Sequence, residues 1–220
     1  MKCDVKTEDK NGKEITKVVE IQAVEYPLMD GDVSSLERLN LKEYRRIARS
    51  TLKALSTMRK EDLAHFDIKP ENILFRKIVD GTRKYKLGDF GLTTYIDDKF
   101  FKPEILETDP KRRGTPEYCA PEIENFDKKL PKNYGEKADT FSLGTTIYFL
   151  YLKDKGEIND ASQLKSKINQ LKTKNIEQLK LDNEQEKNLL DFVQKCVCSN
   201  ESSRLSVKQA LKHPFITKKQ

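Results

Sequence analysis

The sequence has 220 residues, of which 36% are hydrophobic and 35% are charged. This length is enough to bury one sizeable core or two small ones, so we expect a globular protein. No apolar run approaches the length of a membrane span, and the start, MKCDVKTEDK, lacks the apolar stretch of a signal peptide. These features exclude membrane-spanning and secreted classes, and we expect a cytoplasmic protein.

Charge and cysteine content narrow the possible classes of function and site further. Lys and Arg number 42 against 36 Asp and Glu, a net charge of +6, and the two signs are interspersed along the sequence, which gives little support to nucleic-acid binding. Cys3 and Cys119 stand alone, while Cys196 and Cys198 are two apart and would point in different directions on a helix. We expect neither a disulfide framework nor a zinc site, which fits a reducing compartment.

The first 28 residues have the pattern of a hairpin. Two runs, 2–9 and 15–28, flank KNGK, and the Asn11-Gly12 pair is a strong signal for a tight turn. An isolated two-stranded hairpin is only marginally stable in water. We therefore expect a protein partner or a second copy of the chain to cover this hairpin, or the hairpin to fold down onto the rest of the molecule.

A long amphipathic helix is predicted to start at Leu41. Four cations lie on its outer face: Arg45, Arg46, Arg49 and Lys53. The opposite face carries residues that recur at helical spacing, namely Tyr44, Ile47, Ala48, Thr51, Leu52, Leu55 and Met58.

Short strands and further helices follow. NILFRKI and RKYKLGDF predict strands around the turn VDGT, and residues 92–120 have an irregular, polar pattern. Helices are predicted at 138–152, 161–171, 183–197 and 206–213, the last stopped by Pro214. The fold class is therefore α+β, a strand pair followed by a mostly helical body.

Four motifs give the sequence a specific resemblance. HFDIKPEN (65–72) is similar to a protein kinase catalytic loop, and DFG (89–91) to the magnesium loop. GTPEYCAPE (114–122) resembles the end of an activation segment, and DTFSLG (139–144) the central buried helix. The chain thus resembles eukaryotic-type serine/threonine protein kinases from about Val18 to its end.

The resemblance extends to an ion pair and to the division of the chain. Arg204 matches the arginine that pairs with the Glu of Ala-Pro-Glu, here Glu122. The implied division is a remnant of the N-terminal lobe with the hinge in residues 1–28, and the C-terminal lobe in residues 29–220.

The resemblance also implies roles for the motif residues. Phosphoryl transfer mainly requires positioning and charge neutralisation, and magnesium prefers oxygen ligands. Asp67 would act at the acceptor hydroxyl of a protein substrate, and Lys69, which is typical of serine/threonine kinases, would meet the transferring phosphate. Asn72 and Asp89 would bind Mg²⁺ beside ATP, with Asn72 also counted in the catalytic set. Leu74 would lie under the adenine.

Neighbouring residues have supporting roles by the same resemblance. Thr115 would hydrogen-bond Asp67 and Lys69, His65 would pack beneath Phe90, and Asp139 would accept backbone hydrogen bonds from the catalytic loop.

The catalytic loop departs from the family at one position. Phe66 stands where kinases usually have an Arg that grips a phosphate on the activation segment. Thr93, Thr94 and Thr108 are therefore only weak candidates for an activating phosphosite. KRR at 111–113 is interpreted as solvated loop charge, or alternatively as a docking site for an acidic surface.

The nucleotide roof is not found in these 220 residues. The hinge is VEYPL, with Val24 as gatekeeper and Glu25 and Tyr26 beside the adenine, and too few residues precede it for a Gly-rich loop, a phosphate-pairing Lys and its partner Glu. Pro27 has no backbone N–H that could donate a hydrogen bond to adenine. The hinge resembles that of Pim kinases in this respect. Residues 151–160 also lack the Pro-Phe that commonly follows the central helix.

Two functions follow from these observations. The first is a serine/threonine kinase lobe that takes its missing roof from elsewhere. The alternative is a catalytically inactive pseudokinase that acts as a scaffold or binding module. We expect no nucleic-acid partner and no membrane partner in either case.

Overall fold

The computed structural model describes residues 27–96, 114–124, 134–178, 181 and 183–218, together with the backbone of two strands at 2–8 and 14–20. The hinge residues Val24, Glu25 and Tyr26, the phosphosite candidate Thr108 and the KRR segment lie outside the described residues.

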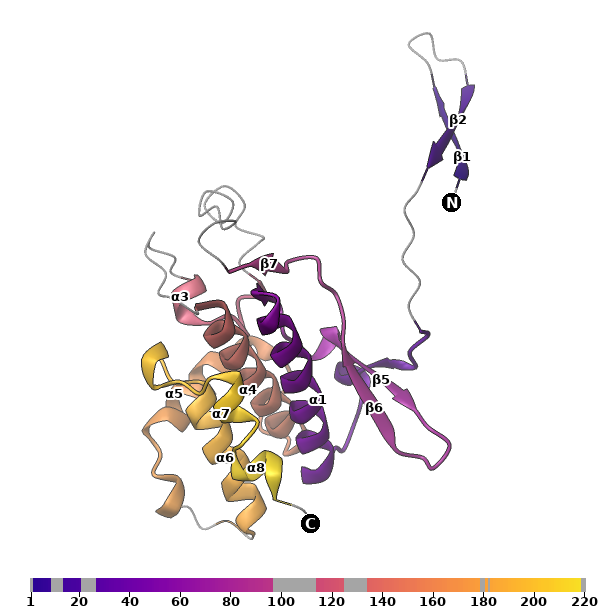
Figure 1. Cartoon of the computed structure of the whole chain (residues 1–220). Helices are drawn as coiled ribbons and strands as arrows, with labels where there is room; N and C mark the ends of the chain where they lie inside the picture. Colours follow the sequence, from indigo (N-terminus) through magenta and orange to yellow (C-terminus); the bar gives the residue numbers. More distant parts are fainter. Residues whose placement is uncertain are drawn as a thin grey trace.

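The strands of the described ranges form three small antiparallel sheets (Figure 1). Strand β1 pairs with β2, β4 pairs with β7, and the third sheet has the order β3-β5-β6. Their bounds are β1 Lys2–Glu8, β2 Glu14–Glu20, β3 Gly31–Asp32, β4 Leu63–Ala64, β5 Ile73–Lys77, β6 Arg83–Leu87 and β7 Thr94–Tyr95. Strands β1 and β2 confirm the predicted strand pair, with Lys2 opposite Glu20 and Glu8 opposite Glu14.

The helices make up most of the described body, in keeping with the α+β prediction (Figure 1). The α-helices are α1 Leu41–Lys60, α3 Pro121–Glu124, α4 Tyr134–Asp154, α5 Leu164–Thr173, α6 Glu184–Cys196, α7 Val207–Ala210 and α8 Pro214–Thr217. Short 3-10 turns are η1 Val33–Ser35, η2 Pro70–Asn72, η4 Ala161–Gln163, η5 Ile176–Gln178 and η6 Glu201–Ser203.

Helix α1 has the predicted extent and orientation. Asn40 begins it, because its side chain accepts a hydrogen bond from the backbone N–H of Glu43. The predicted inward residues from Tyr44 to Met58 are all buried, whereas Arg49 and Lys53 are exposed.

Helix α4 forms the centre of the core. It is buried along almost its whole length, as expected of a helix that is apolar on all sides. Helices α1 and α6 both pack on it. Gly144 allows the close approach of α6, because a Cβ there would lie 2.5 Å from Cys196 Cβ. Among the described residues, Cys119, Cys196 and Cys198 take part in no disulfide.

The β5–β6 hairpin brings the start of β5 next to the end of β6. At the tip Asp80 accepts a hydrogen bond from Thr82 N at 2.8 Å, and Gly81 has φ +78°. At the open end Gly88 N donates to Asn72 O at 2.8 Å. The catalytic-loop and DFG motifs, 17 residues apart from Asn72 to Asp89, are thereby placed side by side.

The helix predicted at 206–213 forms, but it is shorter than predicted. Helix α7 ends at Ala210, and Pro214 starts the separate helix α8 instead of stopping a helix. His213 caps α8 by accepting a hydrogen bond from Phe215 N at 3.2 Å. Proline is favourable in the first turn of a helix, where its missing N–H has no intrahelical partner to lose.

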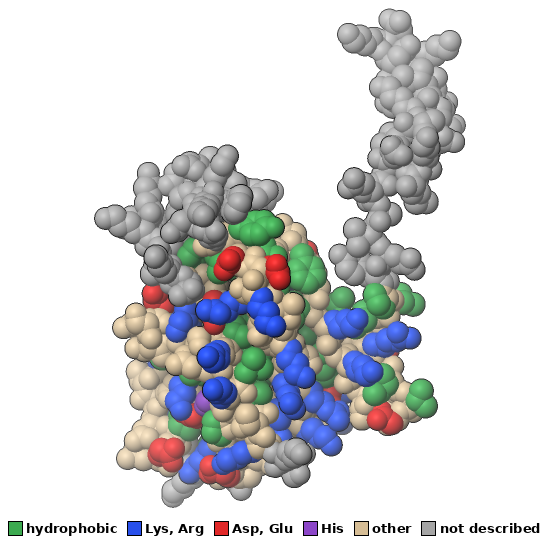
Figure 2. Space-filling view, viewed as in Figure 1, with side chains coloured by type: hydrophobic (Ala, Val, Ile, Leu, Met, Phe, Trp, Pro, Cys, Tyr) green, Lys and Arg blue, Asp and Glu red, His purple; other side chains and the backbone are tan. Residues whose placement is uncertain are grey.

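Charges that are interspersed along the sequence are gathered on the surface. Figure 2 shows Lys and Arg side chains collected over the strip of surface where α1 and the β5–β6 hairpin lie. Among the helices of the described ranges, none is long and apolar enough to cross a bilayer.

Candidate active site

Asp67 lies at the centre of a polar cluster in the loop between β4 and η2. Its Oδ1 accepts hydrogen bonds from Thr115 Oγ1 at 2.7 Å and Thr115 N at 3.1 Å. Its Oδ2 lies 3.0 Å from Lys69 Nζ and accepts from Asn72 Nδ2 at 3.0 Å. Thr115 Oγ1 also accepts from Lys69 Nζ at 2.9 Å, so both predicted contacts of Thr115 are confirmed.

These contacts keep the carboxyl of Asp67 ionised. Burial acts to raise its pKa, but the hydrogen bonds from Thr115 and Lys69, the charge of Lys69 and the hydrogen bond from Asn72 together hold the pKa below its ordinary value. Asp67 is therefore a charged acceptor at neutral pH, fixed on two sides by donors.

His65 links the catalytic loop to the DFG motif. Its Nε2 lies 2.9 Å from Gly88 O, a carbonyl that can only accept, so Nε2 carries the proton. Its Nδ1 then accepts from Asp67 N at 3.3 Å. Burial lowers the pKa of His65, which keeps the ring neutral, and the ring meets Phe90 edge-on with centroids 5.4 Å apart. The predicted packing of His65 against Phe90 is confirmed.

Asp139 anchors the loop from the central helix, as predicted. Its carboxylate oxygens accept hydrogen bonds from His65 N and Phe66 N, each at 2.8 Å. Burial raises the pKa of Asp139 to about 7, although these two hydrogen bonds act in the opposite direction.

Phe66 is an apolar substitute at the usual arginine position. It has φ +63°, is buried and stacks on Tyr134 with ring centroids 5.8 Å apart. An aromatic ring held there has no charge to offer a phosphate on the activation segment.

Gly114 was not predicted to be important, yet it sets the approach of the activation segment to the loop. Its φ is +80°, and a Cβ at this position would lie 2.3 Å from Phe66 O. Only glycine fits both the left-handed backbone and this approach. The signal available in the sequence was its place directly before Thr115.

A cavity of about 510 Å³ is lined by residues of the β5–β6 hairpin and of the DFG motif. Leu74, predicted to lie under adenine, lines it, and so does Asp89, which has a left-handed φ of +54°. The other lining residues are Pro27, Met29, Lys86, Leu87, Gly88 and Phe90.

A second cavity of about 660 Å³ lies on the other side of the catalytic loop. Lys69, Asn72 and Thr115 line one wall. Glu71 and Glu117 also line it, and sequence reasoning missed both, although each lies inside a kinase motif.

A comparison with protein-family models matches residues 13–216 to the protein kinase domain. The chain belongs to the protein kinase domain family. The match covers most of the chain and includes each motif named above.

Named relatives of this kinase domain agree with that assignment. It is 30% identical to death-associated protein kinase 2 of Mus musculus over 82% of this chain and 45% of the relative. It is 31% identical to calcium/calmodulin-dependent protein kinase type I of Schizosaccharomyces pombe over 79% of this chain and 48% of the relative. It is 30% identical to serine/threonine-protein kinase dst2 of Dictyostelium discoideum over 81% of this chain and 14% of the relative. The chain thus spans half or less of each of these relatives.

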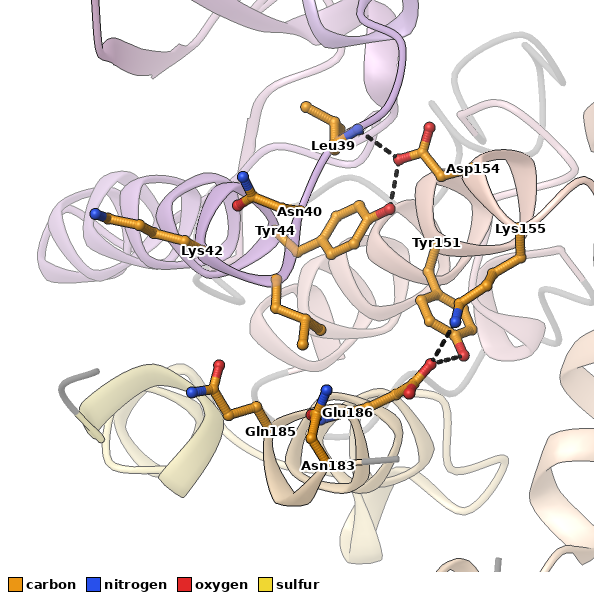
Figure 3. Close-up of a pocket in the computed structure, with 11 residues that line it drawn as sticks. Leu39, Asn40, Lys42, Tyr44, Tyr151, Asp154, Lys155, Asn183, Gln185 and Glu186 are labelled. Carbon is orange, nitrogen blue, oxygen red and sulfur yellow. Dashed lines mark hydrogen bonds and ion pairs between the residues drawn. The ribbon is translucent and has the colours of Figure 1, made fainter. Parts of the chain in front are cut away.

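The kinase domain has a further cavity, of about 540 Å³, away from the motifs (Figure 3). Its two carboxylates are already paired: Asp154 accepts from Leu39 N at 2.9 Å and from the hydroxyl of Tyr44. Glu186 accepts from Tyr151 at 2.5 Å and lies 2.9 Å from Lys155 Nζ. These contacts join α1, α4 and α6, which indicates a structural role for these side chains.

In the described ranges, the motifs of the kinase domain offer a small set of side-chain oxygens to a metal ion. No cluster of three His, Cys, Asp or Glu side chains suited to a metal occurs within the described ranges. Asn72 uses its Nδ2 to donate to Asp67, at 2.8 Å to the backbone O and 3.0 Å to Oδ2. Its side-chain oxygen is left for another partner, and Asp89 at the adjacent strand end adds a carboxylate. This small oxygen set fits Mg²⁺, which takes its remaining ligands from phosphates and water.

Proposed function

We propose that this kinase domain transfers the γ-phosphoryl group of ATP to Ser or Thr hydroxyls of a protein substrate. The observation that carries the proposal is the set of four contacts that the Asp67 carboxylate makes: two with Thr115, one with Lys69 and one with Asn72. A carboxylate fixed in this way, and ionised, is suited to orient an acceptor hydroxyl and accept its proton. Lys69, beside it, supplies positive charge for the transferring phosphate.

The nucleotide would lie in the cavity above Leu74. Asn72 and Asp89 would hold Mg²⁺ through oxygen atoms, and the magnesium would neutralise phosphate charge during transfer. The hinge residues Val24, Glu25 and Tyr26 remain proposed adenine contacts. We keep the boundary between residues 28 and 29 as the proposed division between hinge and C-terminal lobe.

The choice of Ser or Thr as acceptor is supported by two observations. Lys69 is the residue type that serine/threonine kinases have two positions after the catalytic Asp. The relatives named above include a protein described as a serine/threonine-protein kinase. The chain spans half or less of each of these relatives, so the acceptor type and the substrate are part of the proposal.

One observation favours a pseudokinase instead. Pro27 lines the nucleotide cavity and has no backbone N–H for the adenine. Measuring ATP affinity of the purified chain with and without Mg²⁺ separates the two functions. The enzyme requires ATP binding that strengthens with Mg²⁺ and weakens in Asp89→Asn. A scaffold would show no magnesium-dependent binding of ATP, and the parent and Asp89→Asn would give the same result.

We also propose that the β1–β2 hairpin pairs with further strands, from a partner protein or from a second copy. Strands β1 and β2 pair only with each other in the described part of the chain, and a two-stranded sheet is marginal in water. Hydrogen exchange of residues 15–24 should be fast in dilute monomer and slow once the partner is bound. Slow exchange in a partner-free monomer would instead support a hairpin folded onto the domain.

A further inference from the structure

The outer face of α1 carries a line of cations. Successive helical residues are about 100° apart, which places Lys42, Arg46, Arg49, Lys53 and Lys60 within a sector of roughly 60°. We call these five residues the basic stripe. Helix α1 contains a single acid, Glu43, and that side chain is buried against the hairpin and not on the stripe.

The basic stripe has little internal compensation. Among the described residues, Lys42, Arg49, Lys53 and Lys60 form no ion pair, and all four are exposed. Three lysines on other helices of the domain, by contrast, do have acidic partners. The distances are 2.5 Å for Lys165–Glu124, 2.8 Å for Lys167–Glu157 and 2.7 Å for Lys195–Asp191.

Like charges at this spacing oppose helix formation. Residues three and four apart on a helix are neighbours, and each like-charge pair costs about 0.2–0.5 kcal/mol. The series Lys42, Arg46, Arg49 and Lys53 contains three such neighbours in succession. A bound anion would relieve this repulsion.

Positive charge continues from the basic stripe onto the hairpin. Glu43 contacts Arg46 at 2.9 Å and Arg83 of β6 at 3.4 Å, so one carboxylate serves two guanidinium groups and leaves a net positive charge in a fixed place. Exposed Lys77 and Lys84 lie on the same hairpin. Segments 41–60 and 73–87 together hold twelve Lys and Arg against two acids, a net +10, whereas the whole chain has +6. The rest of the chain is therefore net acidic.

We propose that the basic stripe docks an acidic segment of a partner protein. Helix α1 is about 30 Å long, the length of roughly nine extended residues. Its guanidinium and ammonium groups suit the carboxylates of Glu and Asp. This proposal concerns binding alone and does not depend on phosphoryl transfer.

Other polyanions fit the basic stripe less well. The large apolar side chains exposed within the described ranges are Leu28, Val79, Phe90 and Tyr95, and none lies on α1. Single-stranded nucleic acids are usually held by aromatic side chains on which bases stack, and stable membrane docking needs an apolar or lipid anchor besides basic charge.

Fluorescence anisotropy with a labelled peptide of about twelve residues, alternating Glu and Gly, tests this docking. The full chain should bind the peptide, and affinity should fall as salt rises from about 50 to about 200 mM. The double variant Arg49→Glu, Lys53→Glu should bind about tenfold more weakly or worse, since two attractions become repulsions. Both side chains are exposed and unpaired, so the variant should keep the parent's thermal midpoint.

A charge-matched control is Lys174→Glu, Lys208→Glu, which changes two exposed lysines outside α1. It should keep the peptide affinity within about twofold. Equal weakening in both double variants, or no peptide binding by the parent, would overturn the proposal. Tighter binding of oligouridylate or phosphatidylserine vesicles than of the peptide, lost in the α1 variant, would overturn it in favour of another anion.

Discussion

Arg204 and Glu122 form a two-pronged ion pair across 82 positions of sequence. Arg204 Nη1 donates to Glu122 Oε1 at 2.6 Å, and Nη2 donates to Oε2 at 3.0 Å. The guanidinium also donates to Cys198 O and Lys137 O, each at 2.9 Å, and its side chain has no solvent exposure. This confirms the predicted pair and ties the end of the activation segment to the helical core.

Arg204→Ala should lower the free energy of unfolding by about 3–5 kcal/mol, because it leaves the Glu122 carboxylate and two backbone carbonyls without their donor. Chemical denaturation measures the change. Lys165→Ala is the control, because it removes an exposed pair with Glu124 and should cost less than about 1 kcal/mol. Equal losses in the two variants would show that burial of Arg204 contributes nothing.

Asp67→Asn and Asp89→Asn should each abolish phosphoryl transfer while leaving the fold intact. Asp67 is the proposed acceptor for the hydroxyl proton, and Asp89 is the proposed magnesium ligand. Transfer of labelled phosphate from ATP to a Ser-containing protein measures the effect. The exposed control Glu61→Gln should retain full transfer. Residual transfer within a few-fold of the parent in either Asp variant would remove that residue from its proposed role.

Gly114→Ala should reduce transfer by at least about tenfold, because its Cβ would meet Phe66 O and move Thr115 away from Asp67. Gly81→Ala is a matched control, with a similar φ of +78° but nothing within 4 Å of the added Cβ. Both variants should lose about 1 kcal/mol of stability from the left-handed backbone. Only Gly114→Ala should lose transfer, and parallel losses of transfer would contradict the close-approach argument.

The contribution of Asp67 to stability should depend on pH. Its pKa in the folded state lies below the ordinary value of 3.8, so its contacts stabilise the fold fully above that value and are lost as pH falls through the folded pKa. The difference in unfolding free energy between the parent and Asp67→Asn should therefore shrink below about pH 4. A difference that stays constant or grows on acidification would show that Asp67 is not stabilised in its charged form.

Local patterns predicted the elements that have strong periodicity. The apolar spacing from Tyr44 to Met58 predicted α1 because this helix has one buried and one solvated face. Helix α4 begins at Tyr134, four residues before the predicted start, because a helix buried on all sides has no polar face to mark its ends. The break between α7 and α8 depends on capping by His213, which a periodicity argument does not detect.

The candidate site was predictable where a motif fixes residue types and not where contacts depend on three dimensions. Asp67, Lys69, Asn72 and Thr115 meet as the kinase resemblance implied. The surroundings of Phe66 did not follow from sequence, because its stacking partner Tyr134 lies 68 positions away. The cationic outer face of α1 followed from helical spacing, whereas the link through Glu43 from Arg46 to Arg83 of β6 depends on contacts in three dimensions.

The most direct test of the proposed kinase activity is transfer of γ-labelled phosphate from ATP to paired peptides that differ only in having Ser, Thr or Tyr as acceptor. The full chain is incubated with ATP in the presence of Mg²⁺ or of a chelator, with Asp67→Asn as the reference. We predict label on the Ser and Thr peptides only with Mg²⁺, and none with the variant. Binding of ATP and Mg²⁺ without label on any peptide, or equal labelling by Asp67→Asn, would contradict a serine/threonine kinase centred on Asp67.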